Sequence, residues 1–137
     1  MVVRLQRATN GQVFLTATFT PLEAGFHLYS KDMPRNGVHG LGRPTLLELS
    51  PNSKMQGVGA LTESAAAGVS NADPTGVLVY PEGPVTLSLR VNLPAGNGLI
   101  TDEVSVTYMA CSANGCKAPV MGKIIPVKVP GIETISN

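Results

Sequence analysis

The sequence predicts an all-β domain, an immunoglobulin-like antiparallel β-sandwich. Short runs in which apolar and polar residues alternate recur along most of the 137 residues, and such alternation is typical of half-buried strands. The chain also contains 15 glycines and 11 prolines, many of them in turn-like clusters between these runs. No stretch shows a convincing helical period. Seven to nine short strands separated by turn signals favour a sandwich.

The first half of the chain contains the expected core strand 12–19. Its alternate apolar residues should face the interior, whereas Pro21 ends the run. The irregular stretch 31–44 is predicted to be a loop. The inward set of the 12–19 strand is Val13, Leu15, Ala17 and Phe19. The other strands expected in this half cover residues 2–5, 26–30 and 45–49, with a weaker one at 54–61.

The second half begins with a stretch of small residues, 62–76, that has little to bury and is expected to form a surface loop. A single helical turn at 63–67 is the alternative for its first part. The cleanest alternation in the chain then covers residues 85–93. The other strands expected in this half lie at 77–80, 103–109 and 125–129.

The length and composition fit one domain that needs no disulfide in order to fold, since a chain of 137 residues can bury about two thirds of its unfolded surface. We expect the domain to cover residues 1–130 and residues 131–137 to form a C-terminal tail or linker. A formal net charge of +1 and 14% charged residues argue against nucleic-acid binding. No apolar run is long enough for a membrane span, and the first residues lack the apolar segment of a signal peptide.

The chain contains two cysteines, Cys111 and Cys116, and both lie at a predicted hairpin turn. Residues 112–115 between them form a small polar loop that ends in an Asn-Gly pair, which is typical of tight hairpins. Facing residues of an antiparallel pair have Cα atoms about 4.5 to 5.5 Å apart, which suits a disulfide. Strand alternation places Cys111 on the face of Thr107, and Cys116 on the face of Lys128 if no bulge intervenes. We therefore expect both sulfurs to point away from the main core.

A disulfide at this turn would stabilise the fold little. Closing a loop of about six residues removes only about 2 kcal/mol of unfolded-state entropy, against almost 5 kcal/mol for a loop of about a hundred. Lys117, directly after Cys116, would favour its thiolate. These features favour a redox-active pair, although a structural disulfide is the common role of a lone cysteine pair in a secreted β-domain. The spacing is not C-x-x-C, and no thioredoxin-like pattern surrounds it.

The sequence gives weaker support to metal sites and to other kinds of catalytic site. Four sulfurs near the hairpin, those of Met109, Cys111, Cys116 and Met121, would suit Cu(I), but methionines near a hairpin are more often packing residues. Zinc would need paired ligand spacing, which the two histidines lack. No motif of a serine hydrolase or of a phosphate-binding loop is present. We expect no bound metal and no organic cofactor.

The run V-T-Y-M-A-C-S-A-N-G-C-K-A-P, residues 106–119, resembles the V-T-Y-x-x-C…C-x-x-P signature of a known family. This family is the N-terminal extracytoplasmic domain of the thiol:disulfide interchange protein DsbD and its relatives of the copper-sensitivity suppressor type. Residues 25–29, G-F-H-L-Y, are similar to the family's G-[YF]-x-L-Y strand, and residues 79–80 followed by 85–87 match a later strand. Together the matches cover most of the chain in the family's order.

The resemblance implies an immunoglobulin-like fold and a redox-active pair, Cys111 and Cys116. The pair would take electrons from a thioredoxin-like domain or protein and pass them to oxidised extracytoplasmic proteins, in the bacterial periplasm or a comparable compartment. Family members are commonly followed by a membrane domain, so the domain can be membrane-tethered. Some members shield their cysteines with an acidic and aromatic cap loop, and the corresponding stretch here, 70–76, offers Asp73 but no aromatic residue.

The sequence thus predicts a thiol:disulfide oxidoreductase. Cys116 is the expected partner-contacting sulfur, because Lys117 favours its thiolate and Gly115 leaves room for an approaching chain. His27 and Tyr29 alternate outward on their predicted strand and would shape the surrounding partner surface, together with Lys117 and Asp73. The alternatives are a non-catalytic interaction module with a structural hairpin disulfide and a Cu(I)-binding domain.

Overall fold

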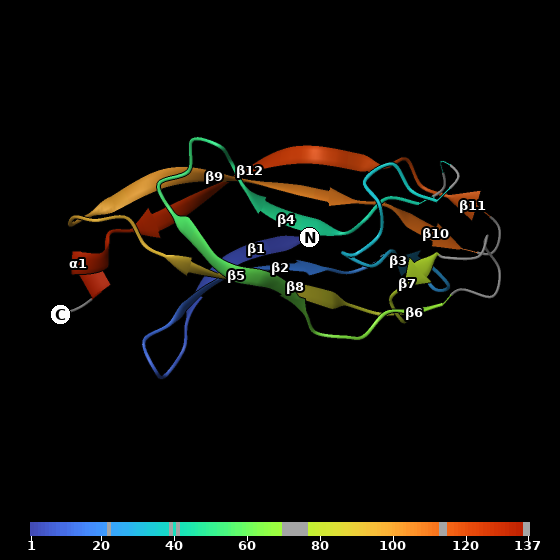
Figure 1. The fold of residues 1–137 in the computed structure, drawn as a ribbon, viewed down its shortest axis with the longest axis horizontal. Helices are drawn as coiled ribbons and strands as arrows, with labels where there is room; N and C mark the ends of the chain where they lie inside the picture. Colours follow the sequence, from blue (N-terminus) through green and yellow to red (C-terminus); the bar gives the residue numbers. More distant parts are fainter. Residues whose placement is uncertain (22, 39, 41, 70–76, 113–114, 136–137) are drawn as a thin grey trace.

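The structure, a computed structural model, describes residues 1–21, 23–38, 40, 42–69, 77–112 and 115–135. Two antiparallel sheets face each other along the length of the molecule (Figure 1). Each sheet contains a strand whose alternate residues are buried, as a two-layer sandwich requires. The first sheet has the order β1 (Val2–Arg7), β2 (Val13–Phe19), β8 (Val85–Asn92) and β5 (Gln56–Glu63). The second has the order β12 (Val120–Pro130), β9 (Leu99–Tyr108) and β4 (Leu46–Leu49).

A smaller sheet lies at one end of the sandwich. It has the order β11 (Gly115–Cys116), β10 (Ala110–Ser112) and β3 (His27–Leu28). The pair β6 (Gly68–Val69) and β7 (Leu78–Val79) lies at the same end, whereas the single helical turn α1 (Ile132–Ile135) lies at the opposite end (Figure 1). Both cysteines therefore lie at one pole of the elongated domain.

The main core lies between the two sheets. The predicted inward set of β2, listed above, is buried as expected, and β8 contributes an equally regular set from its alternate positions. Across the interface, β9 and β12 supply Val104, Val106 and Val129, all 0% exposed. The buried set of β8 is Val85, Leu87, Leu89 and Val91. These strands form because β-branched and aliphatic residues at every second position can pack against the facing sheet.

The architecture agrees with the predicted all-β sandwich, but several boundaries differ. The structure assigns twelve strands within the described residues, more than the seven to nine predicted, because four of them have only two residues. The predicted loop from residue 62 is wrong at its start, since β5 continues to Glu63 and β6 pairs with β7. The predicted loop and the alternative helical turn at 63–67 are both wrong at this point because the end of β5 pairs with β8, where Thr62 lies opposite Ser88. Residues 70–76 lie outside the described part of the chain.

The C-terminal segment is anchored to the domain. Residues 132–135, expected to belong to a tail, form α1, and the amides of Ile132 and Glu133 donate to the carbonyl oxygens of Pro94 and Gly96 at 2.8 and 3.1 Å. A propensity argument cannot find this turn, because a helix of four residues is stabilised by tertiary hydrogen bonds and not by its own length. The proposed boundary at residue 130 stays a prediction.

A second, smaller core lies beneath the end that carries the cysteines. Its buried members are Tyr29, Met33, Val77 and Cys111. The glycine Gly42 closes this cluster with a backbone φ of +76°, and a Cβ atom at this position would lie 2.9 Å from the Tyr29 ring and 3.1 Å from Met33 Cε. Glycine is required here for both conformation and space.

We predict that Gly42→Ala destabilises the domain more than Gly40→Ala. Both glycines have a positive φ, +76° and +77°, but a Cβ at Gly40 would meet nothing within 4 Å. Gly40→Ala should therefore show only the backbone cost of about 1 to 2 kcal/mol, whereas Gly42→Ala should lose about 1 to 3 kcal/mol more through overpacking. Urea unfolding of both variants measures this, and equal losses would contradict the packing argument.

Candidate functional site: a disulfide at the pole of the sandwich

Three side chains form a row across the small sheet. Cys116 on β11 lies opposite Cys111 on β10, and Cys111 lies opposite His27 on β3. Directly opposite residues of antiparallel strands project from the same face of a sheet, with Cβ atoms about 4.5 to 5.5 Å apart. The row therefore places both sulfurs and one imidazole on a single face, at the pole of the molecule.

Cys111 and Cys116 form a disulfide, with Cα atoms 4.0 Å apart, and lie five positions apart in the sequence. The predicted hairpin pairing is thus correct. The two halves of the bond differ in exposure, because Cys111 is only 8% exposed within the second core, whereas Cys116 is exposed. One sulfur is accessible from solvent and the other is enclosed.

The expectation that both sulfurs point away from the main core needs one correction. Cys111 does lie outside the main core, but it is buried in the second core, which the alternation of β9 did not reveal. The alternation cannot be carried through from β9, because that strand ends at Tyr108 and β10 begins at Ala110. The face predicted for Cys116 required that no bulge lie between it and Lys128. This condition is not met, since a register irregularity lies between Val120 and Lys123 of β12. Cys116 is exposed because β11 is a short edge strand of its own.

Local backbone chemistry shapes the hairpin. Gly115 adopts a φ of 147°, which residues with a side chain rarely take. After the turn, the Lys117 amide donates to the Ala110 carbonyl oxygen at 2.9 Å and extends the pairing past Cys116. Residues 113–114, at the tip of the turn, lie outside the described residues.

His27 is half-buried, and its ring is attached to the neighbouring segment. Its Nδ1 lies 3.1 Å from the backbone carbonyl oxygen of Tyr80. Because a carbonyl oxygen can only accept a hydrogen bond, Nδ1 must carry the proton, which leaves Nε2 as the nitrogen that exchanges one. Tyr80 is fully buried, and its hydroxyl donates to a Glu63 carboxylate oxygen and accepts from the Lys31 amide at 3.0 Å. Burial, with the Glu63 bond as a second cause, raises the pKa of Tyr80 far above its ordinary value.

Tyr29 does not face outward as the sequence suggested. It is 3% exposed and belongs to the second core with Cys111. The segment of β3 lies between β10 on one side and the Leu78–Tyr80 segment on the other, with Tyr29 bridged to both Pro44 and Val79. An alternation on an isolated strand could not reveal this second layer. Tyr29 therefore supports Cys111 from within and contributes little surface.

Lys117 lies on the exposed side of the hairpin and pairs with Glu23. Its Nζ is 3.0 Å from Glu23 Oε1 and 5.2 Å from the centre of the Phe26 ring. The pairing with a carboxylate reduces the positive potential that Lys117 can offer to a Cys116 thiolate. A shallow open hollow adjoins Cys116, and its other lining residues are Glu23, Ala24, Gly25, Phe26, Ser112, Gly115 and Lys117.

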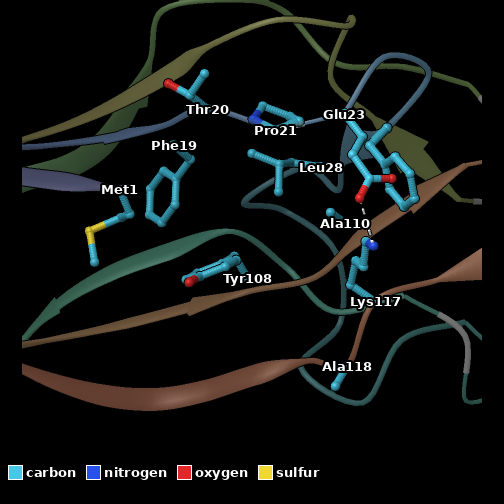
Figure 2. A pocket seen from close by; sticks show the side chains of 11 residues that line it. Met1, Phe19, Thr20, Pro21, Glu23, Leu28, Tyr108, Ala110, Lys117 and Ala118 are labelled. Atoms are coloured by element: carbon cyan, nitrogen blue, oxygen red, sulfur yellow. Dashed lines mark hydrogen bonds and ion pairs between the residues drawn. The ribbon is translucent and has the colours of Figure 1, made fainter.

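A largely apolar groove of about 350 Å³ lies next to this hollow and shares Glu23, Phe26 and Lys117 with it. Figure 2 shows the dashed Glu23 to Lys117 contact at one end of the groove and the rings of Phe19 and Tyr108 toward the other. Leu28 and Ala110, which are opposite each other on β3 and β10, also line it. Since successive strand residues face opposite ways, this groove lies on the reverse side of the small sheet from the cysteine row.

Sequence reasoning selected six site residues, and the structure gathers five of them at one pole. Cys111, Cys116, His27, Tyr29 and Lys117 all lie on or beside the small sheet, while Asp73 lies outside the described residues. Reasoning from sequence missed Glu23 and Phe26, which contact Lys117, and Tyr80, which holds His27. Phe26 and Tyr80 each had a signal, since Phe26 belongs to the 25–29 motif and Tyr80 to the match at residues 79–80.

The structure offers little for a metal. Within the described ranges, no three His, Cys, Asp or Glu residues are close enough to hold an ion. Of the methionines weighed for Cu(I), Met109 packs against the second core, whereas Met121 is 52% exposed on β12. Among the residues that the structure describes, no helix is long and apolar enough to cross a membrane.

Comparison with known proteins supports the fold. No protein-family model matches the sequence, and no curated protein sequence matches it either. Among solved structures, the chain is similar to the N-terminal domain of DsbD from Neisseria meningitidis in its reduced form. The similarity has a TM-score of 0.50 at 14% identity and covers 94% of this chain and 84% of that one. The expected fold, that of the DsbD N-terminal domain, is therefore confirmed.

We predict that loss of the disulfide leaves the domain folded. The bond joins residues only five positions apart, so its removal should lower the free energy of unfolding by only about 2 kcal/mol. Urea unfolding of the protein with and without a reductant measures the difference, and the Cys111→Ala/Cys116→Ala variant serves as a control that cannot reoxidise. Unfolding on reduction would show that the bond is essential to the fold.

Proposed function: thiol:disulfide exchange at Cys116

We propose that this chain is an extracytoplasmic thiol:disulfide exchange domain that relays electrons through the Cys111/Cys116 pair. The observation that supports this most is the unequal exposure of the disulfide, with Cys116 exposed beside an open hollow and Cys111 enclosed. A bond that spans so short a loop adds little stability. A role in exchange explains why one sulfur is nevertheless accessible.

The exchange proceeds by attack of a thiolate on a disulfide sulfur. A partner thiolate attacks Cys116 Sγ, a new bond forms between the partner sulfur and Cys116, and the Cys111 sulfur leaves with the electron pair. A second partner thiol then attacks the partner sulfur of this mixed disulfide and releases Cys116 as a thiolate. The domain is now reduced by two electrons, and the partner is oxidised by two. The same steps in reverse reduce an oxidised protein.

The proposed electron donor is a thioredoxin-like domain or protein, and the proposed acceptors are oxidised extracytoplasmic proteins. The family resemblance of the sequence implies this direction of transfer, and the fold is similar to that of the DsbD N-terminal domain. Disulfide chemistry in general favours an oxidising compartment such as the periplasm. A disulfide that is formed in this structure is the state that such a donor would reduce.

The surrounding residues have different proposed roles. Lys117, Glu23 and Phe26 border the hollow at Cys116 and would contact the approaching partner chain. Tyr29 would hold Cys111 from the second core. Asp73 remains a proposed part of the partner surface on the strength of the family resemblance alone.

The equilibrium reduction potential of the pair tests the proposal. We expect a value between those of thioredoxin and the strong periplasmic oxidants, about −270 to −120 mV, because an electron relay must be both reducible and reducing. Titration in glutathione or dithiothreitol buffers with thiol labelling measures it. A potential below about −300 mV would indicate a structural disulfide and favour a non-catalytic interaction module.

A trapping experiment tests which cysteine meets the partner. The Cys111→Ser variant keeps the exposed Cys116, whereas the Cys116→Ser variant keeps only the enclosed Cys111. Because exchange requires access, we expect Cys111→Ser to form a mixed disulfide at least about tenfold faster with an oxidised thioredoxin-like protein. Both variants should react alike with the same probe in denaturant, which controls for intrinsic thiol reactivity. Equal trapping in the native state would remove the assignment of Cys116.

A further inference from the structure

In the exchange proposed above, the sulfur that leaves, that of Cys111, is buried. When a partner attacks Cys116, Cys111 departs as a thiolate, yet it is 8% exposed and packed with Tyr29, Met33 and Val77. A negative charge in such a setting loses most of its stabilisation by water. A group that can protonate the departing sulfur would lower this barrier.

His27 is placed to be that group. It lies directly opposite Cys111 in the register of β3 and β10, and facing residues share one side of the sheet. The disulfide occupies the other side of Cys111 in the same row, with Cys116 next along. The imidazole and the two sulfurs are therefore consecutive in one row across three strands.

The hydrogen bond to Tyr80 orients the ring for this role. With Nδ1–H donated to the Tyr80 carbonyl oxygen at 3.1 Å, Nε2 is the nitrogen that binds or releases a proton. Tyr80 is itself held by its amide, which donates to the Leu28 carbonyl oxygen at 2.8 Å, and by its buried hydroxyl. The acceptor of His27 is thus a fixed part of the backbone.

We propose that His27 is the proton donor and acceptor of Cys111 during exchange, an inference that rests on the proposed function. As the bond between Cys111 and Cys116 breaks, the protonated ring transfers its Nε2 proton to the departing Cys111 sulfur. The products are a Cys111 thiol, a neutral His27 and a mixed disulfide at Cys116. In the reverse step, neutral Nε2 takes the Cys111 proton, and the resulting thiolate attacks Cys116 Sγ and releases the partner thiolate.

The ionisable groups on the neighbouring segments have partners of their own. On the segment after β3, Lys31 pairs with Asp32 at 2.9 Å. On the side of Tyr80, the tyrosine hydroxyl bonds to Glu63, and Glu82 accepts from the Gly25 amide at 2.7 Å. On β10, the ionisable group is Cys111 itself, and Tyr29, directly after β3, packs with Cys111 in the second core. His27 is thus the group in this set that combines an imidazole, which can both donate and accept a proton, with a place opposite Cys111.

The test is the rate at which dithiothreitol reduces the disulfide between pH 5 and 9, divided at each pH by the concentration of the dithiothreitol thiolate. This correction removes the titration of the reductant. We expect the corrected rate of the wild-type protein to rise as the pH falls and the imidazole gains its proton. His27→Asn can still donate to Tyr80 but cannot transfer a proton, and its corrected rate should be flat and about tenfold or more lower at pH 6.

Glu82→Gln is the matched control, because it removes the carboxylate that bonds to Gly25 while keeping an acceptor oxygen. It should retain the wild-type pH profile. A flat wild-type profile, or a His27→Asn profile that still rises, would overturn the role of His27 while leaving the reduction potential and the trapping result unaffected. A potential below about −300 mV would instead defeat the proposed function.

A second measurement does not depend on any variant. Nitrogen chemical shifts of the wild-type imidazole distinguish the two neutral tautomers, and we expect the form protonated at Nδ1 in the oxidised protein. The opposite tautomer, protonated at Nε2, would leave Nε2 without the lone pair that the proposed role requires, and would overturn the proposal.

Discussion

The pairing of β10 with β3 is the contact on which the site depends. Two register pairs, Ala110 with Leu28 and Cys111 with His27, join residues more than eighty positions apart in the sequence. Because side chains alternate across a strand, these pairs give the small sheet two different faces. One face carries the disulfide and the imidazole above the second core. The other adjoins the main core and the apolar groove.

This arrangement makes the two cysteines chemically unequal although they form one bond. Cys111 lies on the central strand of the small sheet and is buried by Tyr29 and Met33, whereas Cys116 lies on the edge strand and is exposed. An attacking thiolate can reach only the exposed sulfur easily, so the geometry favours one order of bond breaking. The enclosed sulfur then needs local proton chemistry, which is the role assigned to His27.

The exposed side of the hairpin combines charge and apolar surface. Lys117 joins Glu23 and the Phe26 ring, and these three residues border both the hollow at Cys116 and the neighbouring groove. Exposed ion pairs of this kind contribute little stability. Because this ion pair contributes little to the stability of the fold, the two side chains are free to serve the partner contact proposed above. In that proposal Lys117 is part of a surface more than an isolated charge beside Cys116.

The sequence by itself determined the fold class, part of the main core and the position of the two cysteines opposite each other at a hairpin. Alternation in the 12–19 run identified buried positions such as Leu15, and alternation in the 85–93 run identified a half-buried strand, because a strand buried on one face records that burial at every second residue. The Asn-Gly turn placed Cys111 opposite Cys116, because a hairpin is a local structure.

Only the tertiary structure decided the environments of Cys111, His27 and Tyr29. The second core and the Tyr80 carbonyl come from segments distant in sequence, which meet only after the small sheet forms. Local alternation gives the direction of a side chain relative to its own strand, but it does not reveal whether another layer covers that side. For this reason Tyr29 was expected to face outward and Cys111 to point away from the main core, whereas both are buried in the second core. The proton partner proposed for Cys111 became visible only in the fold.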